Sequence, residues 1–358
     1  MNCLSPQVGV VITGEADEIM PDLMSWLKNG QSSDPPLGVF IRNSEGHLVG
    51  YRREPPVHLD SLDDPAYDNP PWPGQWNYPD FPILLSRGCI GRCAFCDVFS
   101  RNGHFRSRSA ERVFGEILKL RTNYPDLKLH FNDSLVNGHL PRLRQFCELM
   151  NRNSLSVPMV GQARCRADMT ERDYQSMRKA GFHTLLFGIE TGSPKVSALM
   201  NKTQFATLED AERAFQQAHD AGIQVGVNLI VGFPGETRME MEETADFVIR
   251  NRKSIDFIAS ISSLSILPET PIWNGPEKYG VAPESIFDPH WRTTDGTNTL
   301  EEREWRKSWM YETLGRHGFG MGQQLKDEPP PLTAADPTRS KPWIGHRILR
   351  SIRRRVRL

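Results

Sequence analysis

Two spacings of hydrophobic residues alternate along the chain between residues 82 and 266. Short apolar runs rich in β-branched residues predict strands, and polar stretches with an apolar residue every three or four positions predict helices between them. The predicted strands cover residues 82–86, 127–133, 158–165, 183–190, 223–232 and 256–266. The predicted helices cover residues 109–124, 141–152, 170–180, 206–221 and 236–252. Regular alternation of this kind predicts parallel strands with helices on the outside.

The number of repeating units decides the architecture. The pattern contains six strands in series, whereas a standard TIM barrel closes with eight strand–helix units. We therefore predict an α/β fold, a partial (β/α)6 TIM-like barrel with a small N-terminal α/β remnant and a helical C-terminal extension. Ser109 occupies the N-cap position of its helix, Glu111 lies in the first turn, and Gly181 ends the helix at 170–180.

The segments on either side of this core are shorter and less regular. In the N-terminal part we predict a strand at 8–13, a helix at 16–30, and a hairpin formed by 37–42 and 47–52; near the other end, residues 296–316 have helical spacing. The chain therefore divides into a small α/β segment (1–53), a Pro-rich linker (54–80), the core (81–270), a C-terminal extension (271–326), and a linker with a basic tail (327–358).

Composition sets limits on the protein class. The 358 residues are 38% hydrophobic and 24% charged, with a formal net charge of −1, so nothing in the overall charge attracts nucleic acid. No apolar run approaches the roughly 20 residues that span a bilayer, and the N-terminus lacks the pattern of a secretory signal. Cys3, Cys147 and Cys165 are scattered singly, which argues against a disulfide framework. We expect a cytoplasmic protein.

The other three cysteines are crowded into "RGCIGRCAFCDVF". Cys89, Cys93 and Cys96 have CxxxCxxC spacing and follow the predicted strand at 82–86, at the end of the strand where barrel folds keep their active sites. Thiolates are soft ligands for zinc or iron–sulfur clusters. Zinc prefers four closed ligands, whereas three thiolates suit a [4Fe–4S] cluster whose fourth iron is left for a small molecule. A non-catalytic iron–sulfur or zinc-binding protein is the alternative.

This loop resembles the CxxxCxΦC motif of the radical S-adenosylmethionine (radical SAM) superfamily, with Phe95 as the aromatic residue before the third cysteine. Further segments resemble, in order, parts of the branch that carries an N-terminal cobalamin (B12)-binding domain. They are "RSRSAERVFGEI" (106–117), "FND" (131–133), "CRADMTERDYQSMRKAGF" (165–182), "LLFGIETGS" (185–193) and "NLIVGFPGET" (228–237).

The resemblance implies the chemistry. Cys89, Cys93 and Cys96 would hold three irons of a [4Fe–4S] cluster, and the amino and carboxylate groups of SAM would chelate the fourth. An electron from a donor such as flavodoxin or ferredoxin would then cleave SAM to methionine and a 5′-deoxyadenosyl radical. That radical would abstract hydrogen from a small-molecule or peptide substrate, which the sequence does not identify.

The resemblance also implies residues that bind SAM. Phe95 would pack near the adenine, Glu190 would accept a hydrogen bond, and Arg166 would pair with the SAM carboxylate. For Glu190 a helix-capping role is the alternative, and for Arg166 a surface ion pair. Asn132 and Asp133, at the end of the second predicted barrel strand, would recognise the SAM amino group.

The motif "GFPGE" (232–236) completes this set of predicted contacts. Gly232 and Pro234 would let the backbone approach the cofactor closely. A tight strand–helix turn explains the glycines as well. Asn228 lies inside the preceding strand and reads as adjacent to the core.

Cobalamin is the cofactor that the sequence leaves in question. Fewer than ninety residues precede the cysteine loop, and the DxHxxG motif for a cobalt-ligating histidine is absent; Asp288 and His290 form an Asp-x-His without the glycine. Residues 8–30 resemble only the last strand and helix of a cobalamin domain. Either the enzyme works without B12, or it is a B12-dependent methyltransferase whose cobalamin domain is on a separate or lost polypeptide.

The basic tail carries a different prediction. From Arg339 to Leu358 the chain has one lysine, seven arginines and no acidic residue. An apolar residue recurs every fourth position, at Ile344, Ile348, Ile352 and Val356. A basic amphipathic helix of this kind contacts an anionic membrane surface or a protein partner, and a disordered solubilising tail is the alternative. Aromatic residues are too few to favour nucleic acid.

Overall fold

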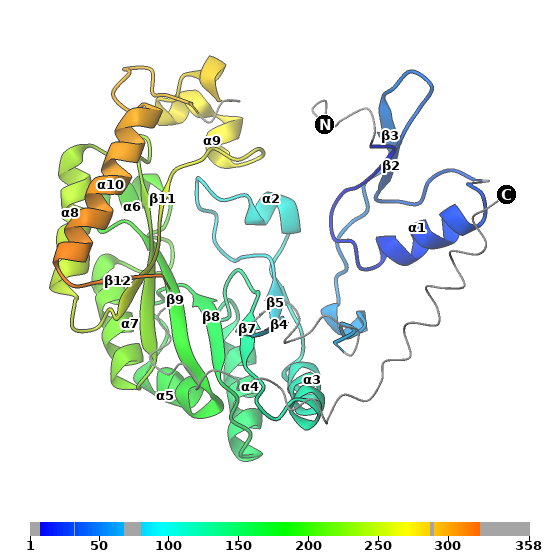
Figure 1. Cartoon of the computed structure of the whole chain (residues 1–358), viewed down its shortest axis with the longest axis horizontal. Coiled ribbons are helices and arrows are strands. Elements are labelled where there is room, and N and C mark those ends of the chain that lie inside the picture. Colours follow the sequence, from blue (N-terminus) through cyan, green and yellow to red (C-terminus); the bar gives the residue numbers. More distant parts are fainter. Residues whose placement is uncertain (1–7, 32, 68–79, 287–289, 323–358) are drawn as a thin grey trace, which may run out of the picture. The chain divides into compact units, whose positions relative to one another are not determined.

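A parallel sheet of seven strands forms the centre of the protein (Figure 1). The structure is a computed structural model that describes residues 8–31, 33–67, 80–286 and 290–322. In spatial order the strands are β4 (Phe81–Ile83), β7 (Leu129–Phe131), β8 (Met159–Ala163), β9 (Phe182–Glu190), β10 (Gln224–Val231), β11 (Phe257–Ser263) and β12 (Gly320–Met321). Neighbouring strands pair in parallel throughout, so the predicted partial barrel is confirmed, with β12 as an unpredicted seventh strand.

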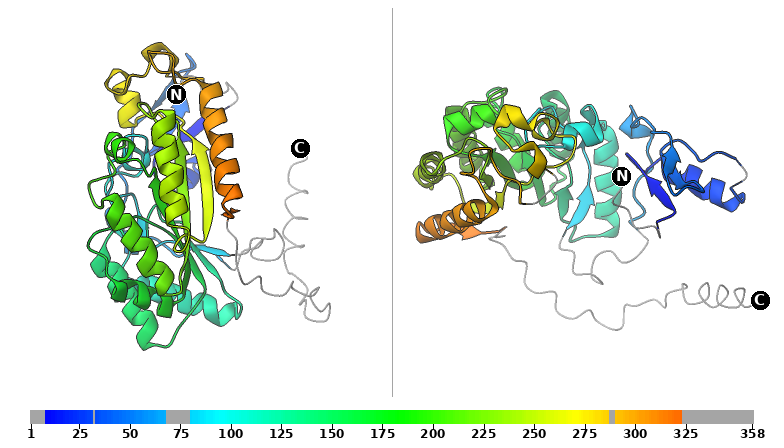
Figure 2. Two further views of the ribbon diagram at one scale, coloured as in Figure 1. Left: turned by 90° about the vertical axis from the view of Figure 1, so that its left-hand side faces the viewer. Right: turned by 90° about the horizontal axis from the view of Figure 1, so that it is seen from above.

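Helices cover one face of this sheet (Figure 2). They are α3 (Ala110–Asn123), α4 (Leu140–Arg152), α5 (Glu171–Ala180), α7 (Leu208–Asp220) and α8 (Arg238–Arg250). The main hydrophobic core lies between them and the sheet, where Phe131 stacks on Phe182 and meets Phe146 edge-on. The sequence signals for the helix ends are confirmed: the Ser109 side chain accepts a hydrogen bond from the backbone N of Arg112, and Gly181 has a φ of +118°.

The N-terminal segment forms its own small sheet. Strands β1 (Val10–Ile12), β2 (Val39–Arg42) and β3 (Leu48–Gly50) pair antiparallel in that order, and α1 (Ile19–Lys28) packs on them through Ile19, Leu23 and Trp26. The predicted hairpin is confirmed. The relation of this segment to a cobalamin domain stays a prediction.

Short elements complete the described chain. Strands β5 (Ser86–Arg87) and β6 (Arg106–Ser107) make a hairpin that encloses the cysteine loop and α2 (Val98–Asn102). The others are η1 (Leu59–Ser61), α6 (Pro194–Leu199), α9 (Pro271–Asn274), η2 (Pro276–Tyr279), η3 (Pro283–Ser285) and α10 (Leu300–Arg316). Most of these are too short to leave a periodic signal in the sequence, whereas α10 confirms the helix expected near 296–316.

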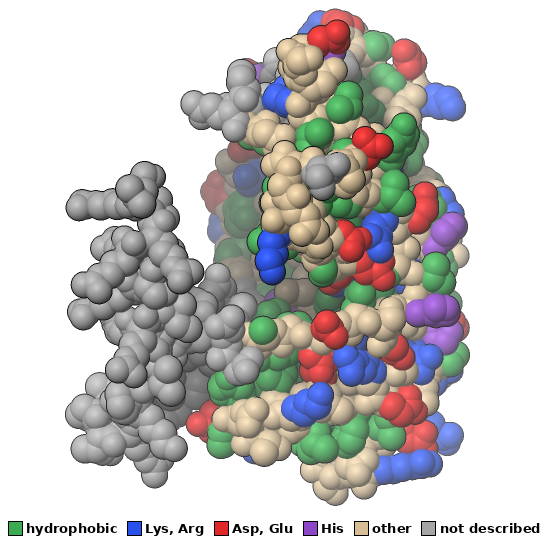
Figure 3. Space-filling model, turned by 90° about the vertical axis from the view of Figure 1, so that its right-hand side faces the viewer, with side chains coloured by type: hydrophobic (Ala, Val, Ile, Leu, Met, Phe, Trp, Pro, Cys, Tyr) green, Lys and Arg blue, Asp and Glu red, His purple; other side chains and the backbone are tan. Residues whose placement is uncertain are grey.

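The surface agrees with the balanced composition. On the face seen in Figure 3, basic and acidic side chains are interspersed. Within the described residues, no helix has the length and apolar character needed to cross a bilayer. The basic tail at 327–358 lies outside the described residues, so its predicted contact with a membrane surface or a partner stays a prediction.

Candidate active site

The turn between β4 and β5 fixes the start of the cysteine loop. The carboxylate of Asp133, which follows β7, accepts hydrogen bonds from the backbone N of Leu85 at 3.0 Å and from Ser86 Oγ at 2.5 Å. Asp133 is buried, and that burial raises its pKa to about 7. Its carboxylate therefore holds the strand-to-loop turn, and its predicted contact with SAM stays a prediction.

The three cysteines of the loop differ from those in the core. Cys89, Cys93 and Cys96 are partly exposed, whereas Cys147 and Cys165 are buried, and all five are free thiols. Burial raises the pKa of Cys96 to about 11, and it also raises the pKa of Cys89. Partial exposure at the carboxyl edge of the sheet leaves these thiols accessible to a metal cluster.

Two backbone hydrogen bonds hold the middle of the loop. The backbone N of Ala94 donates to the carbonyl of Met200 at 3.0 Å, and the backbone N of Ile272 donates to the carbonyl of Ala94 at 3.2 Å. Ala94 is buried in a cluster with residues of α6, α9 and the C-terminal extension, against which Phe95 packs. The C-terminal extension is thus part of the framework of the loop.

An arginine at the end of β8 faces the cysteine loop. Arg164 Nη1 lies 3.6 Å from Cys93 Sγ, and Nη2 donates to the carbonyl of Lys202 at 3.0 Å. The guanidinium also lies over the ring of Phe205, with Cζ 4.6 Å from the ring centroid. Sequence reasoning did not single out this arginine.

Glu190 ends β9 in a strained conformation. Its φ is +66°, a value that costs a residue with a Cβ about 1–2 kcal/mol. The carboxylate binds Lys202 Nζ at 3.2 Å, and the same ammonium donates to the carbonyl of Gly188 at 2.6 Å. A Cβ on Gly188 would come within 2.6 Å of Glu190 Oε1, so the glycine makes room for the carboxylate. Backbone strain of this kind is typical of functional sites.

A chain of polar side chains crosses the face of the sheet opposite the helices. Asn228 Nδ2 donates to Gln162 Oε1 at 3.3 Å, and Ser260 Oγ donates to Asn228 Oδ1 at 2.8 Å. A small apolar cluster of Val160, Leu186 and Phe257 lies on β8, β9 and β11. Gln162 and Ser260 are further site residues that sequence reasoning missed.

A signal for these two residues was present in the sequence. Each is a polar residue within a strand whose neighbours are apolar or small, in "MVGQA" and "FIASISS". A polar side chain in a strand of a largely buried parallel sheet needs a hydrogen-bond partner.

Comparison with known proteins identifies the core. Residues 83–248 match the model of the radical SAM superfamily. This chain contains a radical SAM domain. An uncharacterized methyltransferase of Pyrococcus horikoshii, PH0819, is 26% identical over 295 residues, which are 80% of this chain and 61% of the relative. The chain therefore spans less than two thirds of the length of that relative.

Two solved structures share the radical SAM fold. The methyltransferase TsrM of Kitasatospora setae, solved with tryptophan and a SAM analogue, has a TM-score of 0.62 at 18% identity and covers 74% of this chain and 53% of its own. The cobalamin-dependent radical SAM enzyme OxsB, solved with aqua-cobalamin and SAM, has a TM-score of 0.56 at 18% identity over 78% of this chain and 39% of its own. At these identities the likeness concerns the fold.

The cofactors of the radical SAM superfamily are a [4Fe–4S] cluster and SAM, and the donor set of the loop fits such a cluster. Three soft thiols lie on one partly exposed loop. Among the described residues, no three His, Cys, Asp or Glu side chains are close enough to share a single metal ion. A cubane does not require that arrangement, because each thiolate binds a different iron.

The structure places Arg166 differently from Arg164. Its guanidinium forms a bidentate pair with Asp168, at 2.8 and 2.7 Å, and donates to the carbonyls of Asn137 and Gly138. This is the alternative of an ion pair that the sequence left open, and the predicted contact of Arg166 with SAM stays a prediction.

The "GFPGE" corner after β10 is closed by the C-terminal extension. Gly232 and Pro234 are buried. The backbone N of Gly232 donates to Glu236 Oε1 at 2.8 Å, and its carbonyl accepts from Asn298 Nδ2 at 3.0 Å. A Cβ at Gly232 would overlap the side chain of Arg303. Both backbone groups of Gly232 are thus paired within the protein, and the predicted close approach of Gly232 and Pro234 to the cofactor stays a prediction.

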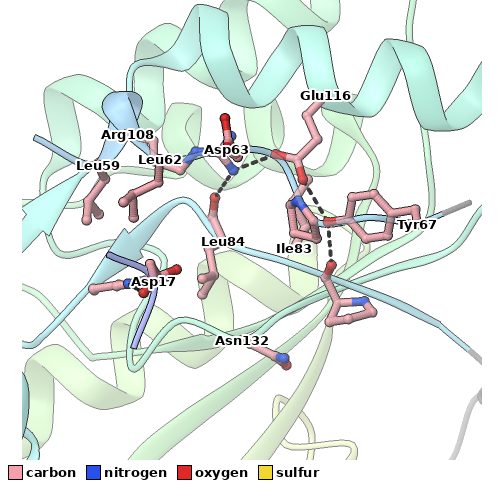
Figure 4. Close-up of a pocket in the computed structure, with 13 residues that line it drawn as sticks. Asp17, Leu59, Leu62, Asp63, Tyr67, Ile83, Leu84, Arg108, Glu116 and Asn132 are labelled. Atoms are coloured by element: carbon pink, nitrogen blue, oxygen red, sulfur yellow. Dashed lines mark hydrogen bonds and ion pairs between the residues drawn. The ribbon is translucent and has the colours of Figure 1, made fainter. Parts of the chain in front are cut away.

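Asn132 lines a pocket beside β4, shown in Figure 4. In this pocket Glu116 accepts hydrogen bonds from Tyr67 at 2.7 Å and from Arg108 at 2.5 Å, and Arg108 also donates to the carbonyl of Leu84. The predicted contact of Asn132 with the SAM amino group stays a prediction, as does the contact of Phe95 with the adenine.

Proposed function

We propose that this chain is the catalytic part of a radical SAM methyltransferase. The observation that carries the proposal is the loop of Cys89, Cys93 and Cys96, which presents three partly exposed thiols at the carboxyl edge of the sheet. The methyl-transfer part of the proposal is supported by the methyltransferase PH0819, which matches most of this chain. The substrate that would be methylated is left open.

Each part of the site has a task in this proposal. When bound, a cluster on the three cysteines would supply the electron that cleaves SAM reductively. Glu190, held by Lys202, would accept hydrogen bonds from SAM, and the polar chain of Gln162, Asn228 and Ser260 would offer donors and acceptors below it. The two backbone hydrogen bonds of the buried residue Ala94 would hold the loop that carries the cysteines in place.

The first experiment tests the cluster and the cleavage together. After anaerobic reconstitution, we expect a [4Fe–4S] electron paramagnetic resonance signal that shifts when SAM is added, and 5′-deoxyadenosine should accumulate with dithionite. Cys93→Ala should lose the cluster and the cleavage together, because two thiolates rarely hold a cubane.

The control removes a thiol that lies elsewhere. Cys147→Ala removes a buried thiol in α4, and this variant should still bind iron and cleave SAM. Stoichiometric zinc without iron, or a cluster that never cleaves SAM, would contradict the proposal and favour the non-catalytic alternative.

The second experiment tests methyl transfer. SAM that gives up its methyl group leaves S-adenosylhomocysteine. We expect this product, together with methylcobalamin as the methyl acceptor's product, when cob(I)alamin is supplied to the reconstituted chain, free or on a cobalamin-binding protein. If cobalamin has no effect on the products while 5′-deoxyadenosine still forms, the chain is a radical SAM enzyme of another reaction class.

A further inference from the structure

Arg164 is held both at its backbone and at its guanidinium by residues outside the cysteine loop. The Asn137 side chain accepts from the backbone N of Arg164 at 3.0 Å and donates to its carbonyl at 2.7 Å. At the other end, Lys202 and Phe205 hold the guanidinium. Asn137 is 1% exposed and Arg164 is 9% exposed. The charge is thus held in a position set by its own contacts.

The cysteine loop is shaped to accept this charge. Gly91, between the first two cysteines, is buried, and a Cβ there would overlap Arg164 Nη1. The backbone N of Gly91 also donates to Cys89 Sγ at 3.3 Å. A residue without a side chain is therefore what allows the guanidinium to reach 3.6 Å from Cys93 Sγ.

Arg92, the sequence neighbour of Cys93, lies in a different environment from Arg164. Arg92 is exposed, and its guanidinium lies over the ring of Phe99 at 3.4 Å. Water and salt screen an exposed charge, whereas a buried charge is screened much less. Arg164 and Arg92 thus carry the same charge near the same loop in opposite environments.

We propose that Arg164 is a positioning residue that sets the reduction potential of the cluster through its charge beside Cys93. The inference rests on the proposed function, since it requires a cluster on the three cysteines. One-electron reduction adds a negative charge to a cluster, and a neighbouring cation stabilises that reduced form. Net charge and hydrogen bonds to sulfur are the protein's means of tuning such potentials.

The experiment is a redox titration of the reconstituted protein, followed by electron paramagnetic resonance, without substrate. Arg164→Gln should lower the ratio of reduced to oxidised cluster at a fixed ambient potential by about tenfold, which is about 59 mV for one electron. Gly91→Ala should lower the ratio in the same direction, because it displaces the guanidinium and leaves the charge in the chain. Arg164→Lys keeps the positive charge, so its ratio of reduced to oxidised cluster should lie close to the wild-type ratio.

The matched control is Arg92→Gln, which removes the same charge from an exposed position. It should change the ratio less than about threefold, because water screens that charge. An Arg164→Gln variant with full iron and sulfide content and the wild-type ratio would overturn the inference. So would loss of the cluster from every Arg164 variant, Arg164→Lys included, since that result assigns the residue to loop folding.

The outcomes separate the inference from the proposed function. A wild-type protein that takes up no iron and sulfide contradicts the proposed function, and the inference falls with it. A wild-type cluster that cleaves SAM, with a potential that none of the Arg164 and Gly91 variants changes, overturns the role of Arg164 alone.

Discussion

Two loops follow strands at the carboxyl edge of the sheet, the cysteine loop after β4 and "GFPGE" after β10. The sequence of each predicts contact with a cofactor, but their surroundings in the structure differ. At the first of these corners, the cysteine loop carries partly exposed thiols and meets Arg164. Glu190, at the end of β9, has a strained backbone with a φ of +66°. At the second corner, Gly232, Phe233, Pro234 and Glu236 of "GFPGE" are buried, and both backbone groups of Gly232 are paired. The two strand ends therefore differ in how far neighbouring segments cover them, a difference that their sequences do not show.

The second corner is held by charges that are far from water. Glu236 is 5% exposed and Arg306 is 3% exposed, and their side chains meet at 3.1 Å. Burial raises the pKa of Glu236 to about 7 even with the arginine beside it. Arg303 lies over Trp291 with Cζ 3.8 Å from the ring centroid. Hydrogen-bonded contacts between buried side chains, such as the pair of Glu236 and Arg306, rigidify the corner.

The largest expected effect is at the buried corner. Arg306→Ala leaves Glu236 buried without its partner and should cost about 3–5 kcal/mol of unfolding free energy. Chemical denaturation at neutral pH measures it, with Arg316→Ala at the exposed end of the same helix as the control, expected within about 0.5 kcal/mol. A loss below about 1 kcal/mol for Arg306→Ala would show that the corner is not held by this pair.

A second substitution tests the same corner through the backbone. Gly232→Ala places a Cβ at a φ of +76° and against Arg303, so it should cost about 2 kcal/mol. Gly280→Ala is the matched control, because its φ of +68° is similar and no atom lies within 4 Å of the added Cβ. If both variants lose the same unfolding free energy, the whole effect comes from backbone strain and none from the overlap with Arg303.

Substitution of Glu190 should affect SAM binding more than stability. Glu190→Gln removes a carboxylate that would contact SAM, and we expect about a tenfold weaker binding of SAM, or about 1.4 kcal/mol. Unfolding free energy should change by less, because Lys202 still donates to the carbonyl of Gly188. Isothermal calorimetry with the reconstituted protein gives the affinity. Unchanged SAM binding together with a large loss of stability would place Glu190 with the buried corner.

The last prediction concerns the pH dependence of stability. The pKa of Asp133 is raised to about 7 in the folded protein, from an ordinary value of 3.8. Between these values the folded state binds a proton that the unfolded state does not, so stability falls as pH rises from about 4 to 7. Asp133→Asn should remove up to about 1.4 kcal/mol per pH unit of this slope, measured by denaturation across that range. An unchanged slope would contradict the raised pKa.

Much of the fold was predictable because its signals are local. The strands of the barrel, its outer helices, the cap at Ser109 and the stop at Gly181 depend on spacing and on the conformational preferences of single residues. The short elements α2, α6 and β12 were not predicted, because a few residues carry too little periodicity. They matter for the site all the same, since α6 binds the cysteine loop.

The sequence by itself determined the alternation of strands and helices, and it determined the cysteine spacing that marks a radical SAM domain. Only the tertiary structure decided which polar residues face that loop. Arg164 and Arg166 are two residues apart on one strand end, and no local rule distinguishes them. Packing does: the first reaches Cys93 across Gly91, and the second binds Asp168. Contacts between segments distant in sequence depend on the folded arrangement, which local spacing does not contain.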